Sequence, residues 1–213
     1  DAQESRGLGD VYKRQIITHT ITTNMNLIFA SGNQNKVIEI QKIVPKNITI
    51  KSLKDLNFHE EIPENEKTIE GNAIFKAKFI NSRFNLNVFA DDTGLEVKHL
   101  NGDPGVHSAR YAGLDCNSTN NVQKLLKKLE NVENRSARFK TVIALIINNK
   151  IQVFEGIVEG SILKKPRGDN GFGYDPVFCP MGFDKSFAEI SLKEKNLISH
   201  RSLAMKKLID YIS

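Results

Sequence analysis

The chain is poor in the residues that mark secreted, zinc-binding and membrane proteins. Its 213 residues include only two cysteines, Cys116 and Cys179, and no tryptophan. Two cysteines so far apart support neither a disulfide framework nor a zinc site. The longest apolar run, 142–147, is much shorter than the roughly 20 residues needed to cross a bilayer. We therefore predict a protein of the reducing cytoplasm that has no membrane partner.

Residues 1–24 lack the continuous apolar core of a signal peptide and show neither a helical nor a strand period. Met25, in contrast, opens a clean strand pattern. We expect residues 1–24 to be a non-native or disordered extension. Residues 25–213 are expected to form one domain.

The overall composition is that of a globular protein with a basic surface. Hydrophobic residues make up 39% of the chain and charged residues 26%, which is ordinary for a folded domain. The formal charge of +5 is compatible with nucleic acid, an anionic membrane surface or a small anionic ligand. Charge alone does not choose among these ligands. The lysines are scattered along several segments, which argues against a dedicated nucleic-acid stripe, and we expect no nucleic-acid partner.

Strand and helix patterns alternate along the chain. Strands are predicted over 26–31, 48–53 and 88–90, the last ending at two aspartates, and helices over 33–44 and 69–84. A third helix is predicted to be capped by Ser118 or Thr119 and to run through Leu129. A long hairpin over 138–162 is expected to turn at Asn148-Asn149. A capping box at Ser191 opens a final helical segment that runs through Ile212. This order indicates an α/β protein with a mixed central sheet and flanking helices.

One candidate anion site lies where the first strand meets the first helix. Free amides at a helix N-terminus attract anions, and the segment here is Ser31, Gly32, Asn33, Gln34, Asn35 and Lys36. A lysine in the first helical turn opposes the helix dipole unless a phosphate lies between them. The segment lacks the spacing of a standard P-loop. A routine turn with a surface lysine remains the alternative.

Carboxylates form a second candidate group. Asp91 and Asp92 follow an apolar strand, so their side chains should point to opposite sides of the sheet, and only one should face a site. Hard oxygen ligands are what Mg²⁺ selects, whereas the alternative is an Asx turn that closes the strand at Gly94. Several glutamates precede the second helix, and such a run of acidic residues usually forms a solvent-exposed surface. Asn72 and Lys76 lie one helical turn apart and can face a common ligand.

The third candidate group combines aromatic rings with two basic side chains. Phe172, Gly173, Tyr174 and Asp175 lie in a glycine-rich segment, where the rings either stack on a purine or pack into the core. Arg201 falls inside the apolar stripe of the last helix, so its guanidinium must reach solvent or find an anion. His200 lies at the edge of that stripe. We expect the two to flank one pocket, although a structural histidine is the commoner case.

Six short motifs follow one another in a fixed order. They are Ser31-x-Asn33-x-x-Lys36, Glu70-x-Asn72-Ala73-x-x-Lys76-Ala77, Asp91-Asp92-Thr93-Gly94-Leu95, Pro104-Gly105-x-x-Ser108-Ala109-Arg110-Tyr111, Gly171-Phe172-Gly173-Tyr174-Asp175-Pro176-x-Phe178 and Ser199-His200-Arg201. Together they resemble the inosine/xanthosine triphosphate pyrophosphatase family over residues 25–213. The resemblance implies an elongated two-lobed domain with a nucleotide cleft between its lobes, and a homodimer. It also implies Mg²⁺-dependent hydrolysis of ITP, dITP and XTP to the monophosphate and pyrophosphate.

The resemblance also implies roles for single residues. Ser31 to Lys36 hold the triphosphate, and Asp92 is the general base and a metal ligand, with Thr93 beside it on the substrate. Phe172 to Asp175 stack on and bound the base, whose edge His200 and Arg201 read. Lys185 matches a further substrate lysine. Glu64 matches the second metal ligand, although Asn65-Glu66 follows it where the family usually has Thr-Gly.

Two rival hypotheses remain at this stage. The first is a pyrophosphatase of related fold, of the septum-inhibitor type, that acts on modified pyrimidine nucleotides. Its motifs differ from those at 172–175 and 199–201. The second is a basic module that binds nucleic acid through exposed aromatic side chains. Triphosphate hydrolysis would separate the enzymes from the binding module.

Overall fold

The computed structural model describes residues 25–213, so the prediction for residues 1–24 lies outside the described part. Within that part the α/β prediction is confirmed, because seven strands form one mixed sheet with helices packed around it. No helix in residues 25–213 has the length and apolar composition to span a membrane. The strands are β1 (Met25–Phe29), β2 (Ile48–Ser52), β3 (Val88–Val97), β4 (Pro104–Gly105), β5 (Ser136–Ile147), β6 (Lys150–Ile162) and β7 (Phe178–Pro180). The α-helices are α1 (Gln34–Gln41), α2 (Ile69–Phe84), α3 (Ser118–Lys128), α4 (Leu192–Ile198) and α5 (His200–Ile212).

The sheet has the strand order β2-β1-β3-β5-β6-β7, and β4 pairs with the far end of β3. β1 runs parallel to β2 and β3, whereas all other pairs are antiparallel. The predicted hairpin is confirmed as β5 and β6. It turns at Asn148 and Asn149, whose φ angles of 50° and 60° are in the left-handed region that asparagine tolerates.

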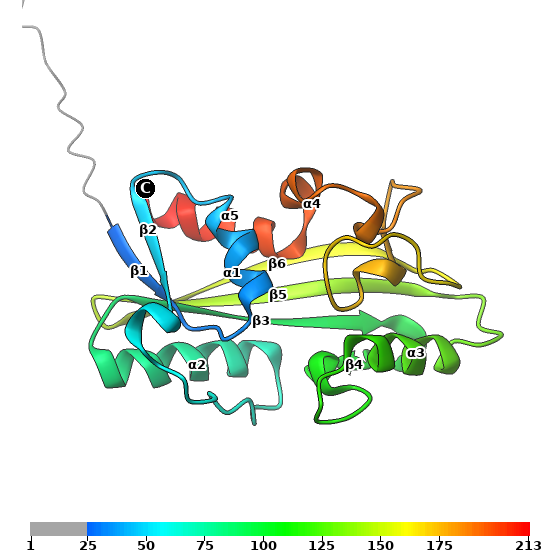
Figure 1. Cartoon of the computed structure of the whole chain (residues 1–213), viewed down its shortest axis with the longest axis horizontal. Coiled ribbons are helices and arrows are strands. Elements are labelled where there is room, and N and C mark those ends of the chain that lie inside the picture. The colour runs from blue at the N-terminus through cyan, green and yellow to red at the C-terminus, as the bar shows by residue number, and fades with distance from the viewer. Residues whose placement is uncertain (1–24) are drawn as a thin grey trace, which may run out of the picture.

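Alternation along the strands separates two cores in the first half of the molecule. Val88 and Ala90 pack with α2 on one face, whereas Phe89 packs with α1 and α5 on the other. A third core lies toward the far end of β3 and β5, where Leu95 and Phe139 pack with α3 and with the segment around Phe178. In Figure 1, α1, α4 and α5 lie above the long strands, and α2 and α3 lie below them. The molecule is therefore elongated, with a lobe at each end of shared strands.

One edge of β3 is bare between these lobes. β1 pairs with β3 only as far as Phe89, and β4 pairs with it only from Leu95 onward. Between these points, residues 90–94 pair with β5 on one side, and no strand of residues 25–213 pairs with them on the other side. The gap lies where the sequence Asp91-Asp92-Thr93 falls, so three polar side chains stand at an opening in the sheet.

Four details of the predicted elements were wrong. β3 does not end at the aspartates but continues to Val97, because every residue from Val88 to Val97 pairs with β5. The alternative Asx turn is thereby excluded. Asn117, not Ser118 or Thr119, caps α3 by accepting a hydrogen bond from Asn120 N. The final segment is two helices, because Ser199 is extended and caps α5. Leu197, expected in the apolar stripe, is 74% exposed.

Candidate active site

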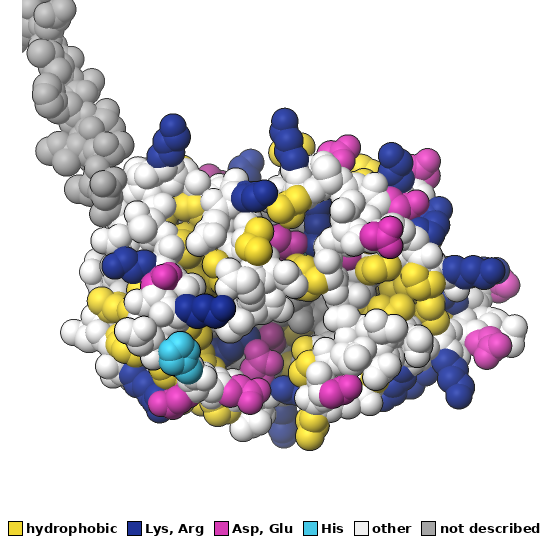
Figure 2. All heavy atoms as spheres, in the orientation of Figure 1, with side chains coloured by type: hydrophobic (Ala, Val, Ile, Leu, Met, Phe, Trp, Pro, Cys, Tyr) yellow, Lys and Arg dark blue, Asp and Glu magenta, His cyan; other side chains and the backbone are white. Residues whose placement is uncertain are grey.

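A cleft of about 380 Å³ opens at the bare edge of β3, and its volume suits a ligand the size of a nucleotide. Its lining comes from both lobes, from the start of α1, the loop before α2, β3, α5 and the loop that carries Phe172. Figure 2 shows a hollow near the middle of this face with acidic and basic side chains in it. The cleft therefore brings together segments that are far apart in the chain.

Asp92 points to the α2 side of the sheet. Its Oδ2 accepts a hydrogen bond from Asn72 Nδ2 at 3.1 Å, and its Oδ1 lies 3.4 Å from Lys76 Nζ. Lys76 also contacts Glu64 Oε1 at 2.6 Å. Asn72 is held in turn, because its Oδ1 accepts a hydrogen bond from Glu66 N. The Asn72 side chain therefore links the loop that carries Glu64 to the strand that carries Asp92.

Asp91 points to the opposite side, toward α1 and α5. Its Oδ1 accepts a hydrogen bond from Lys36 Nζ at 2.9 Å, and its Oδ2 accepts one from Arg201 Nε at 3.0 Å. The expectation that the two aspartates face opposite sides is confirmed. Arg201 is 2% exposed and also pairs with Glu39, so it has found anions rather than solvent.

The two carboxyl groups differ in protonation behaviour. Burial tends to raise the pKa of Asp91, but the charges of Lys36 and Arg201 outweigh burial and hold it well below the usual value. Burial raises the pKa of Asp92 against the opposing charge of Lys76. For Lys76, the attraction of Asp92 and Glu64 outweighs burial and raises its pKa, so it stays charged. Asp91 is thus a fixed anion, whereas Asp92 is the stronger base.

The loop carrying Phe172 is fixed from beneath by Asp175. The Asp175 carboxylate accepts hydrogen bonds from Phe172 N at 2.8 Å and from Lys195 Nζ at 2.6 Å. Lys195 lies 4.9 Å from the centre of the Phe172 ring, and the Arg201 guanidinium carbon lies 5.6 Å from it. The half-buried ring therefore stands at the cleft wall in contact with two cations.

Tyr174 and His200 are more deeply buried than a freely stacking ring would be. Tyr174 is 5% exposed, and its hydroxyl donates a hydrogen bond to Ser108 O at 2.9 Å. His200 stacks on Phe139 with a centroid distance of 4.4 Å. Burial and the charges of Arg201 and Lys195 lower the pKa of His200 well below 6.5, so the ring is neutral. Both residues line the cleft, so each presents one edge to a ligand there.

The acidic residues suit a divalent metal only in part. No cluster of three or more histidine, cysteine, aspartate or glutamate side chains occurs in residues 25–213. Glu64 and Asp92 nevertheless contact the same ammonium group, so the two carboxylates already share one cation. Mg²⁺ typically binds proteins through one or two carboxylates together with substrate phosphates. The pair therefore fits a metal that is completed by its substrate.

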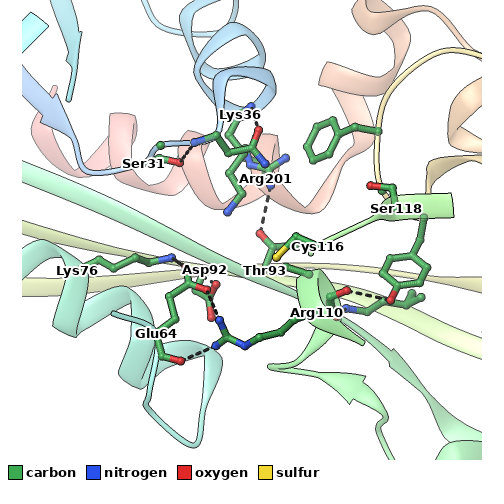
Figure 3. A pocket seen from close by; sticks show the side chains of 18 of the residues that line it. Ser31, Lys36, Glu64, Lys76, Asp92, Thr93, Arg110, Cys116, Ser118 and Arg201 are labelled. Carbon is green, nitrogen blue, oxygen red and sulfur yellow. Dashed lines mark hydrogen bonds and ion pairs between the residues drawn. The ribbon is translucent and has the colours of Figure 1, made fainter. Parts of the chain in front are cut away.

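The structure brings most of the predicted site residues together. Figure 3 shows Lys36 and Arg201 on one side of Asp92 and Thr93, with Lys76, Glu64 and Arg110 on the other. Asn72 does not line the cleft but contacts Asp92, as described above. Three more predicted residues lie outside the lining, namely the exposed Gln34, Asn35 and Lys185. Those that line the cleft are Ser31, Gly32, Asn33, Lys36, Glu64, Lys76, Asp92, Thr93, Phe172, Gly173, Tyr174, Asp175, His200 and Arg201.

Sequence reasoning missed three charged residues. Lys195 lines the cleft where Lys185 had been expected, and Glu39 links it to Arg201. Each offered a signal. Glu39 lies three residues after Lys36 on the same helical face, and Lys195 lies between Leu192 and Ile198 at helical spacing. Arg110 was part of a motif without an assigned role, and it donates a hydrogen bond to Glu64 O.

Comparison with known proteins shows the family of the chain. The model of the Ham1 family matches residues 27–211. The dITP/XTP pyrophosphatase of Flavobacterium johnsoniae is 54% identical over 189 residues, which cover 89% of this chain and 98% of that protein. The dITP/XTP pyrophosphatase of Porphyromonas gingivalis is 50% identical, with 87% and 96% covered. The solved Ham1 protein of Staphylococcus aureus is 39% identical with a TM-score of 0.80, covering 88% of this chain and 97% of that one. This chain belongs to the Ham1 family.

Proposed function

We propose that the protein hydrolyses the triphosphates of non-standard purines, namely ITP, dITP and XTP, to the monophosphate and pyrophosphate. The observation that carries this proposal is the placement of Asp92 between two groups of cations, within one cleft that also carries the Phe172 ring. The relatives named dITP/XTP pyrophosphatase support the choice of substrate. The activity would remove aberrant nucleotides from the cytoplasmic pool.

The phosphates are proposed to bind between the two lobes. A triphosphate carries about four negative charges, which must be neutralised before a nucleophile can approach phosphorus. Lys36 and Arg201 approach from the α1 and α5 side, and Lys76 approaches from α2. Ser31, Gly32 and Asn33, just before α1, line the same end of the cleft, where the positive end of the helix dipole also favours an anion. On this proposal, the cations of the cleft bind a small anion, which accounts for part of the net positive charge of the chain.

Asp92 is proposed to act as the general base. Its Oδ2 is held by Asn72, and its Oδ1, which contacts Lys76 in the ligand-free protein, is the oxygen that would accept a proton from the attacking water. The water oxygen bonds to the α-phosphorus as the bond to pyrophosphate breaks in line. Glu64 and Asp92 are the residues that would hold Mg²⁺, which supplies charge neutralisation at the phosphates. The raised pKa of Asp92 makes it a better base than an exposed aspartate.

Base selection is proposed to occur at the purine 6 position. Lys195 and Arg201 lie against the Phe172 ring, on which the base would stack, and His200 lines the same cleft. Donors directed at a 6-oxo group would face the 6-amino group of adenine instead. Such buried mismatches can discriminate by roughly 10⁴. ATP is therefore expected to be a poor substrate.

The decisive test is a pyrophosphate-release assay with ITP, XTP, GTP, ATP and dUTP, each with and without Mg²⁺. We expect rapid release from ITP and XTP, slow release from ATP, and loss of activity with EDTA. Preference for dUTP would favour a pyrimidine nucleotide pyrophosphatase. Salt-sensitive binding to single strands without hydrolysis would favour the nucleic-acid module.

We also propose that the protein works as a homodimer. The family resemblance supports this, whereas the cleft described here is built from one chain. Sedimentation equilibrium at micromolar concentration tests it. A species of about 48 kDa, twice the 24.0 kDa of one chain, is expected.

A further inference from the structure

The ammonium group of Lys76 lies between the two carboxylates that are the candidate metal ligands. Its Nζ is 2.6 Å from Glu64 Oε1 and 3.4 Å from Asp92 Oδ1. The other oxygen of Asp92 already accepts a hydrogen bond from Asn72. Lys76 therefore contacts the one Asp92 oxygen that is otherwise left for a metal or for a water.

We propose that Lys76 is an internal cation that competes with a divalent metal for Glu64 and Asp92, and that it releases them when a phosphate anion binds. The inference rests on the proposed function to the extent that the anion is a nucleotide triphosphate. Lys76 would then have a positioning role beyond phosphate binding, because its ammonium would couple metal binding to nucleotide binding.

The charges around the pair support competition. Glu64 and Asp92 supply two negative charges, and Lys76 neutralises one of them from a side chain that is only 7% exposed. Arg110 lies 3.8 Å from Glu64 and further reduces the local negative charge. A divalent cation that entered without an anion would meet an unscreened ammonium at close range. The free protein should therefore bind divalent metal weakly.

A triphosphate changes this balance because it offers Lys76 another anion. Lys76 lies in the middle of α2 and carries its ammonium on a flexible four-carbon stem. The ammonium can therefore move from the two carboxylates toward a phosphate in the cleft without movement of the helix. Release of Asp92 Oδ1 and Glu64 Oε1 then leaves two hard oxygen ligands facing one another. Nucleotide and metal should consequently bind with positive coupling, each increasing the affinity for the other by the same factor.

Mn²⁺ binding to the nucleotide-free protein, measured by electron paramagnetic resonance, tests the inference without any turnover. Lys76→Met removes the internal cation while keeping the length and apolar stem of the side chain. We expect Mn²⁺ to bind the variant at least about tenfold more tightly than the unchanged protein. The same titration with an α,β-methylene analogue of ITP should show strong coupling in the unchanged protein and little in the variant.

Lys36→Met is the matched control, because Lys36 is also a largely buried cleft lysine but pairs with Asp91 on the other side of β3. Its charge also acts on Asp92 and Glu64 but without contacting either, so Lys36→Met should raise the Mn²⁺ affinity of the free protein by much less than Lys76→Met does. Adding Asp92→Asn to Lys76→Met should abolish the gain, which locates the ion. If Lys76→Met does not fold, as judged by circular dichroism, Lys76→Gln replaces it with the same expected gain.

Unchanged or weaker Mn²⁺ binding in folded Lys76 variants would overturn the inference. That outcome would leave Lys76 a phosphate ligand only. Failure of the proposed function looks different, since the unchanged protein would then release no pyrophosphate from ITP. The Mn²⁺ gain in the free variant does not depend on that result.

Discussion

Asp91 and Asp92 are adjacent in the sequence, yet they belong to different environments. Asp91 is fully buried and bonded to Lys36 and Arg201, whereas Asp92 faces the cleft and contacts Asn72 and Lys76. The pKa of Asp91 is lowered and that of Asp92 is raised. The period of two along β3 produces this difference, because it sends neighbouring side chains to opposite faces. One carboxylate fixes the positions of cations, and the next is available for chemistry.

Of the substitutions that test this difference between the two aspartates, removal of the charge of Asp91 should have the largest effect. Asp91→Asn leaves Lys36 without its anion and Arg201 with Glu39 alone. Loss of one partner of a buried ion pair typically costs about 3–5 kcal/mol, so we expect a loss of that size in the free energy of unfolding. Urea denaturation followed by circular dichroism measures it. Glu96→Gln, which breaks a partly exposed pair with Arg138, should cost under about 1 kcal/mol. Equal losses in the two variants would contradict the structural role of Asp91.

The matching change at the neighbouring position should affect turnover instead. Asp92→Asn keeps the shape of the side chain but removes the base, so turnover of ITP should fall at least about 100-fold. Nucleotide binding, measured by isothermal titration calorimetry, should persist because Lys36 and Arg201 are unchanged. Near-normal turnover in this variant would remove Asp92 from the mechanism.

A smaller effect should follow from loosening Asp92 while leaving its charge. Asn72→Ala removes the hydrogen bonds to Asp92 Oδ2 and from Glu66 N, so the loop carrying Glu64 loses its tie to β3. Orienting partners of this kind typically contribute 10- to 100-fold, and we expect a loss of about tenfold in turnover. Asn81→Ala on the same helix is the control, since Asn81 only contacts Leu86 O at the surface. If both variants lost activity equally, the orienting role of Asn72 would be refuted.

The smallest expected effect concerns the buried histidine on the Asp91 side of the cleft. His200 has a pKa well below 6.5 in the folded protein, so the unfolded chain binds its proton first as the pH falls. Stability is therefore fully present above pH 6.5 and decreases below it. Between pH 7.5 and 5.5 this group should cost about 1 kcal/mol of unfolding free energy. His200→Gln should lose less stability than the unchanged protein over the same interval. Parallel curves for the two proteins would show that His200 does not titrate in this way.

Local patterns predicted much of the fold and the opposed aspartates. Two asparagines that tolerate left-handed φ angles predicted the β5–β6 turn, and strand alternation predicted the split at Asp91 and Asp92. The length of β3 was missed because Asp-Asp-Thr-Gly has little intrinsic strand preference. Its pairing with β5 overrides that preference, and only the tertiary structure shows this pairing.

The buried charge network could not be predicted from local patterns. Lys195 bonds to Glu39, which is 156 residues away along the chain, and nothing near either residue specifies that contact. Sequence spacing could place each side chain on a helical face but not bring two such faces together. The place of Lys195 in the cleft was missed for this reason, since only the fold distinguishes a buried lysine such as Lys195 from an exposed one such as Lys185.

The bare edge of β3 also determines how the molecule can flex. β3 and β5 run without interruption from one lobe into the other, so the lobes share one sheet and are not connected by a flexible linker. Any closure must bend these strands, and the weakest point is residues 90–94, where one ladder alone resists bending. Asp92, the proposed general base, lies within this segment, so a ligand bound there would contact both lobes at the point where the sheet bends most easily.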